Sequence, residues 1–75
     1  MERGEEMKKN IVLSWRKRIG LTQEEMASKL GIGVVTYRSK ERGITEFKRS
    51  EIENFTREVM KVVPEVTVSE IFFDL

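Results

Sequence analysis

Apolar residues recur at helical spacing along most of the chain, and this pattern predicts an all-α fold. The first predicted helix covers residues 7 to 19, and we expect residues 1–6 to be frayed because they are charged and lack periodicity. The buried stripe of this helix is marked by apolar side chains at i, i+3 and i+7, namely Val12, Trp15 and Ile19. We therefore expect Trp15 to be a core anchor.

Two shorter helices are predicted between residues 22 and 43, joined by a tight turn. Thr22 and Glu25 form a capping-box pattern that begins the first of them. Gly31 follows its last apolar residue, where a glycine in a left-handed conformation ends a helix at low cost. Gly33 can then begin the second helix. Two short helices joined in this way form a helix-turn-helix.

A fourth helix is predicted from residue 48 or 49 to Val63, because Pro64 cannot continue it. Its apolar stripe consists of Ile52, Phe55, Val59 and Val62. The loop before it has two apolar anchors, Ile44 and Phe47. A second capping-box pattern over residues 67–70 predicts a fifth helix of one to two turns, in which the bottom of the core is closed by Ile71, Phe72 and Phe73.

Length and composition limit the functions that are open to the chain. Seventy-five residues suffice for one small core, so we expect residues 1–75 to form a single domain. The absence of cysteine and histidine excludes disulfides, thiol catalysis, ordinary zinc sites and imidazole acid–base chemistry. The sequence has no convergent polar cluster or phosphate loop, so we expect neither an enzyme nor a cofactor or metal.

The same composition argues against a membrane. No apolar run approaches the roughly 20 residues of a membrane-spanning helix. The charged first six residues are unlike a signal peptide. We therefore expect a cytoplasmic protein without a membrane partner.

Charge is distributed unevenly along the chain. The net charge is only +1, but residues 16–49 contain nine basic and four acidic side chains, and the flanks are net acidic. A basic middle with acidic ends is typical of a nucleic-acid-facing surface and a solvated back. Because helical surfaces often carry mixed charge, this pattern alone is modest evidence.

Three segments resemble the signature of the Xre-type, lambda-repressor-like helix-turn-helix family, which includes many phage repressors and Cro proteins. They are Gly20-Leu21-Thr22-Gln23-Glu24-Glu25-Met26-Ala27, Leu30-Gly31-Ile32 and Glu41-Arg42-Gly43. The resemblance extends from about Val12 to Phe73. Within the family, the chain resembles a subgroup found in prophages and mobile elements of Gram-positive bacteria. It implies a five-helix lambda-repressor-like DNA-binding domain in which helices 2 and 3 form the helix-turn-helix.

The resemblance also implies which residues contact double-stranded DNA. The positions at which the family reads or clasps DNA hold Gly33, Val34, Val35, Thr36, Arg38 and Ser39. Gln23 matches a residue that hydrogen-bonds a backbone phosphate, at a helix N-terminus that itself favours anions. Neighbouring phosphates would be neutralised by Lys40, Arg42, Lys48 and Arg49.

Several of these positions depart from the family pattern or have a structural role in it. Val34 and Val35 stand where polar residues are more common, so direct base contacts should depend mainly on Thr36, Arg38 and Ser39. Lys40 replaces a residue that is usually apolar. Arg16 and Glu41 match a pair that commonly forms a salt bridge between helices 1 and 3 in the family.

Two functions are consistent with these observations. The first is a small transcription regulator, Cro-like or a minimal repressor, that binds a palindromic operator as a homodimer because one short recognition helix covers too few base pairs. The second is a helix-turn-helix protein that binds another protein, such as an anti-repressor or an assembly partner. The first is the leading hypothesis, and the apolar pair Val34-Val35 and the low net charge are the features that keep the second one open.

Overall fold

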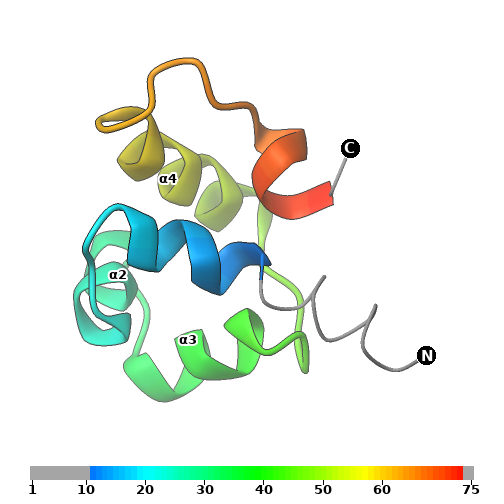
Figure 1. Cartoon of the computed structure of the whole chain (residues 1–75). Coiled ribbons are helices and arrows are strands. Elements are labelled where there is room, and N and C mark those ends of the chain that lie inside the picture. Colours follow the sequence, from blue (N-terminus) through cyan, green and yellow to red (C-terminus); the bar gives the residue numbers. More distant parts are fainter. Residues whose placement is uncertain (1–10, 74–75) are drawn as a thin grey trace.

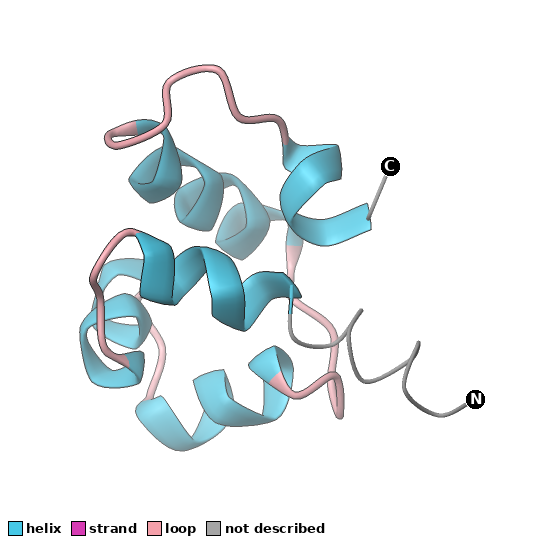
Figure 2. Cartoon of the chain, in the orientation of Figure 1, coloured by secondary structure: helices cyan, strands magenta, loops and turns pink. Residues whose placement is uncertain are grey.

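Five helical segments follow one another in residues 11–73, the part of the chain that the computed structural model describes, and these residues contain no strand (Figure 2). They are an initial helix over residues 11–18, α2 (Gln23–Leu30), α3 (Val34–Glu41), α4 (Arg49–Met60) and a single π-helical turn, η1 (Ser69–Phe73). The predicted all-α, five-helix architecture is confirmed. The predicted start of the first helix and the frayed residues 1–6 lie outside the described residues.

Both ends of α2 are formed by the residues that the sequence indicated. Thr22 Oγ1 accepts a hydrogen bond from the Glu25 backbone N–H at 3.0 Å, and Glu25 Oε1 accepts one from the Thr22 N–H at 2.9 Å. These two bonds complete a capping box. At the other end, Gly31 has φ of 74°, which is left-handed, and the following Ile32 N–H donates to the Ala27 carbonyl at 3.0 Å. The helix therefore ends in a glycine cap.

The turn after α2 leads directly into α3. Gly33 is the N-cap of α3 and Arg42 its C-cap, after which Gly43 adopts φ of 85°. In Figure 1, α3 lies at the lower edge of the molecule, whereas α4 and the orange-red turn η1 lie toward the upper side. The initial helix runs between these two sides in that view. This arrangement leaves α3 at one face of the fold.

The core lies between the helices and is rich in aromatic side chains. Its fully or almost fully buried apolar members are Met26, Ala27, Leu30, Tyr37, Phe55, Val59, Val66 and Ile71. The half-buried Phe47 makes edge-to-face contacts with three other rings, with centroid distances of 5.3–6.2 Å to Tyr37, Phe55 and Phe72. Trp15 packs partly buried against the core, and the Arg18 guanidinium lies 4.9 Å from its ring centroid. Trp15 is therefore an anchor at the edge of the core.

Three apolar residues that the sequence assigned to the core are exposed. α4 ends at Met60 instead of Val63, so Val62 leaves the helical stripe and is 57% exposed. Pro64 disfavours the helical conformation at the residue before it, Val63, and so accounts for part of this shortening. Ile44 is 67% exposed and is held through its backbone N–H, which donates to the Ser39 carbonyl. Phe73 is 56% exposed, because a single helical turn directs only part of its circumference toward the core.

Candidate nucleic-acid interface

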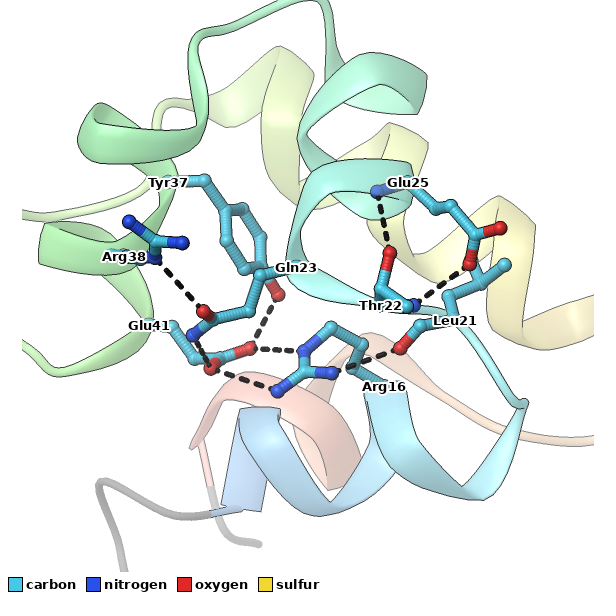
Figure 3. Close-up of polar contacts among 8 residues, drawn as sticks. All are labelled: Arg16, Leu21, Thr22, Gln23, Glu25, Tyr37, Arg38 and Glu41. Carbon is cyan, nitrogen blue, oxygen red and sulfur yellow. Dashed lines mark hydrogen bonds and ion pairs between the residues drawn. The ribbon is translucent and has the colours of Figure 1, made fainter.

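A buried ion pair joins the initial helix to the end of α3. Arg16 Nε lies 2.7 Å from Glu41 Oε2, and Arg16 Nη2 lies 3.2 Å from Glu41 Oε1 (Figure 3). The third guanidinium nitrogen of Arg16 donates to the Leu21 carbonyl at 2.9 Å. Both side chains are buried. The salt bridge that the family resemblance implied is present, and it fixes α3 relative to the initial helix.

Two further donors converge on the same carboxylate. The Tyr37 hydroxyl donates to Glu41 Oε2 at 2.6 Å, and Gln23 Nε2 donates to Glu41 Oε1 at 2.9 Å (Figure 3). Each oxygen of Glu41 therefore accepts two hydrogen bonds. Tyr37 was not among the residues that the sequence singled out, although its i, i+4 spacing from Glu41 on one helix was a signal that could have revealed the contact.

These contacts determine the charge states of the buried network. Burial alone would raise the pKa of the Glu41 carboxyl, but the hydrogen bonds from Arg16, Tyr37 and Gln23 outweigh it and lower that pKa below its ordinary value. Burial raises the pKa of the Tyr37 hydroxyl, and the neighbouring carboxylate raises it further. The hydrogen bond to Glu41 raises the pKa of Arg16. At neutral pH the network is thus an ionised pair with a neutral phenol as an additional donor.

Gln23 connects this buried network to an exposed side chain of α3. Its Oε1 accepts a hydrogen bond from Arg38 Nε at 3.0 Å, while its amide nitrogen donates to Glu41 (Figure 3). Arg38 Nη2 also lies 3.4 Å from Glu24 Oε2. The structure thereby connects the expected Arg16–Glu41 pair with two residues that were assigned to DNA contacts, Gln23 and Arg38. It also adds Glu24, which the sequence did not single out.

The predicted base-reading residues differ in their exposure. Gly33, Thr36 and Arg38 are exposed, and Val35 is 71% exposed. Ser39 is half-buried. Val34 is also half-buried and packs against the core, so part of its surface is unavailable to a ligand. The exposed surface of α3 is accordingly more polar than the Val34-Val35 sequence suggested.

Lys40, which was assigned to a DNA phosphate, is not a free surface cation in the structure. The Lys40 side chain is 8% exposed, and its ammonium pairs with Glu51 at the start of α4, 2.5 Å from Nζ to Oε1. Lys40 was grouped with the phosphate-binding cations although the family usually has an apolar residue at this position. A buried carboxylate partner explains how the charge is accommodated inside the fold.

Glu51 serves two neighbours at once. In addition to Lys40, its Oε1 accepts the backbone N–H of Lys48, the N-cap of α4, at 2.8 Å. Burial alone would raise the pKa of Glu51, but the bonds from Lys40 and the Lys48 N–H lower it. The remaining cations assigned to phosphates are exposed, namely Arg42, Lys48 and Arg49.

Residues 11–73 contain no group of three acidic, histidine or cysteine side chains placed to hold a metal ion. Within the same residues, every helix is too short or too polar to cross a membrane.

A comparison with protein families identifies the arrangement. The helix-turn-helix family model matches residues 12–54, more than half of the chain. The matched segment extends from the initial helix through α2 and α3 into α4, so it contains both members of the buried ion pair. Comparison with curated proteins and with solved structures gives no match. The chain belongs to the Cro/C1-type, lambda-repressor-like helix-turn-helix family of DNA-binding regulators.

Proposed function

We propose that this protein is a sequence-specific transcription regulator, a small repressor of phage or mobile-element type, that binds a palindromic operator with α3 in the major groove. The observation that carries the proposal is the exposed Arg38 on α3, joined through Gln23 to the buried network that fixes α2 and α3 relative to each other. A guanidinium held on a recognition helix can make a bidentate contact to guanine, the commonest specific base contact.

The N-terminus of α2 supports a phosphate contact beside this helix. Gln23 is the first residue of α2, where unpaired backbone N–H groups and the helix dipole favour an anion. Its amide nitrogen has two hydrogens, and Glu41 accepts one of them. The second hydrogen is suited to a phosphate oxygen. Exposed cations that can neutralise flanking phosphates are Arg42, Lys48 and Arg49.

Direct readout by one copy would cover few base pairs. α3 has eight residues, which corresponds to a helix of about 12 Å. A helix of this length contacts too few bases for genomic specificity, whereas two copies on symmetric half-sites double the recognised sequence. We therefore propose that the protein binds DNA as a homodimer.

Two binding experiments test this function. Selection of bound sequences from a random DNA pool should give a palindrome whose half-sites are separated by about one helical turn, 10–10.5 base pairs. Gel shifts on random DNA should weaken as salt is raised, because phosphate contacts release counterions. A pool without enrichment, together with no salt-dependent binding of random DNA, would contradict the proposal.

A second candidate function is binding to another protein, and the exposure of Val35 favours it. Val35 is 71% exposed at the edge where polar base-reading residues are more usual. The substitution Val35→Ser distinguishes the two functions. It should leave DNA affinity within a small factor if α3 reads DNA through Arg38, and it should disrupt a protein complex if Val35 is a contact in an apolar interface.

A further inference from the structure

Arg38 makes contacts to α2 that its proposed role in base recognition does not require. Arg38 Nε donates to Gln23 Oε1 at 3.0 Å, and Arg38 Nη2 lies 3.4 Å from Glu24 Oε2. Within residues 11–73, Arg38 Nη1 has no hydrogen-bond partner in the structure. Both contacts come from consecutive residues in the first turn of α2.

The orientation of the Gln23 amide follows from the buried network. An ionised carboxylate only accepts hydrogen bonds, so Glu41 must face the amide nitrogen of Gln23. The amide oxygen is thereby turned toward Arg38 Nε (Figure 3). A flipped amide would place its oxygen against the Glu41 carboxylate and its nitrogen against the guanidinium, and both contacts would be repulsive. The ion pair in the core thus determines which atom Gln23 presents to Arg38.

Glu24 acts on Arg38 in a different way. Its side chain is 65% exposed and that of Arg38 is 47% exposed, so their ion pair is solvated and weak. DNA acceptors can replace Glu24 at the guanidinium, whereas the Gln23 contact to Nε leaves the Nη1 and Nη2 nitrogens available for a base. Glu24 also places a negative charge beside the phosphate-binding helix N-terminus, where it disfavours contact with DNA that offers Arg38 no specific partner.

We propose that Gln23 is a positioning residue that holds Arg38 for base recognition, and that Glu24 is a competitor that specific DNA must displace from Arg38. This inference rests on the proposed function and assigns to α2 a role in sequence discrimination beyond phosphate contact. The effects of substitutions at Gln23 and Glu24 then depend on whether Arg38 is present.

A double-mutant cycle on the selected operator tests this dependence. Gln23→Met keeps the side-chain volume and removes the amide, and Glu24→Gln removes the charge. Gln23→Met should weaken binding in the wild-type background. In the Arg38→Ala background, the fold loss of affinity that it causes should be smaller by a factor of about three or more. Glu24→Gln should strengthen binding in the wild-type background by about threefold more than in Arg38→Ala. Equal effects in both backgrounds would overturn the proposal, because they would mean that Gln23 and Glu24 act on phosphates alone.

Controls separate this coupling from general charge and folding effects. Glu65→Gln removes the same charge from an exposed loop position and should leave the affinity unchanged. Arg38→Lys keeps a cation at position 38 but has no Nε donor, so Gln23→Met should lose its extra effect in that background too. Thermal melts of every variant establish that the compared proteins are folded.

A measurement without DNA distinguishes failure of this inference from failure of the proposed function. The Nε–H resonance of Arg38 in a 15N-correlation spectrum, assigned with Arg38→Lys, should exchange slowly with water and shift in Gln23→Met. Fast exchange and no shift would overturn the positioning role even if the protein binds its operator. If the resonance is protected and shifts in Gln23→Met but the protein binds no DNA, the Gln23–Arg38 contact is supported and the proposed function is contradicted.

Discussion

Tyr37 and Glu41 lie one helical turn apart on α3 and share a buried hydrogen bond of 2.6 Å between the phenol oxygen and Oε2. The Tyr37 side chain is fully buried, so it packs in the core while its hydroxyl supports the carboxylate that holds Arg16 and Gln23. One tyrosine therefore links the packing of the helix-turn-helix to its polar network.

Tyr37→Phe should destabilise the domain although it preserves the ring. It removes a hydrogen bond to a charged group, which costs about 2 kcal/mol and should lower Tm by roughly 10 °C in a domain of this size. Thr56→Val is a matched control, because it removes a buried hydroxyl that donates only to the neutral Ile52 carbonyl. Thermal unfolding followed by circular dichroism measures both. If Tm falls equally in the two variants, the hydrogen bond to the charged Glu41 stabilises the fold no more than a hydrogen bond to a neutral carbonyl.

Arg16→Ala should have a larger effect, because it leaves Glu41 buried without its cation. Breaking a buried ion pair by removing one partner costs about 3–5 kcal/mol. The neighbouring Lys17→Ala, at an exposed position of the same helix, should change stability little. Urea denaturation of the two variants compares their free energies of unfolding, and an unchanged midpoint for Arg16→Ala would argue against the ion pair.

Lys40→Met should affect stability and leave DNA contacts intact. It removes the cation from the buried Glu51 and should cost about 3 kcal/mol. Adding Glu51→Gln should recover part of the loss, because the amide oxygen still accepts the Lys48 N–H and no unpaired charge remains buried. Chemical denaturation of both variants tests this recovery.

The DNA measurement on the same variants separates Lys40 from the exposed cations. The folded double variant should bind random DNA with the wild-type salt dependence, whereas Arg42→Ala should reduce the slope of log affinity against log salt by about one. A reduced slope for the Lys40 variant would restore this residue to the DNA interface.

The sequence predicted the local features of the fold better than its longer-range contacts. The Thr22 cap and the Gly31 stop are determined by neighbours within four residues, and both were identified correctly. The end of α4 was not, because the turn before Pro64 removes Val62 from a stripe that continues in the sequence. Periodicity alone does not show where a helix stops.

The candidate site shows the same division. The Arg16–Glu41 pair spans 25 residues and was expected only from the family resemblance. No sequence signal paired Lys40 with Glu51, eleven residues away on another helix, so its charge was assigned to the surface. The contact of Gln23 with Arg38 also depends on how α2 and α3 cross. Such contacts become visible only when the helices are placed together.

Acid should unfold the domain through two of its carboxylates. The pKa values of Glu41 and Glu51 are lowered in the folded state. As pH falls, the unfolded chain therefore binds more protons than the folded chain. Their contribution to stability is complete above the unfolded-state value of about 4.3 and is lost as pH decreases through the lower folded values. Melts from pH 7 to pH 2 should therefore show Tm falling below about pH 5. In the Lys40→Met/Glu51→Gln variant, Tm should decrease less steeply with falling pH than in the wild type. An equally steep decrease would contradict a contribution of Glu51 to acid unfolding.

Arg38→Ala should weaken specific binding more than binding to random DNA. Loss of a bidentate contact to guanine costs about 1–3 kcal/mol on the selected operator and should relax specificity at one base pair in each half-site. Arg57→Ala removes the same charge from an exposed position of α4 and serves as the matched control. Competition binding with operators changed at each position measures the loss base by base. An equal loss of affinity for operator and random DNA would mean that Arg38 contacts only the phosphate backbone, because a phosphate contact carries no direct sequence information.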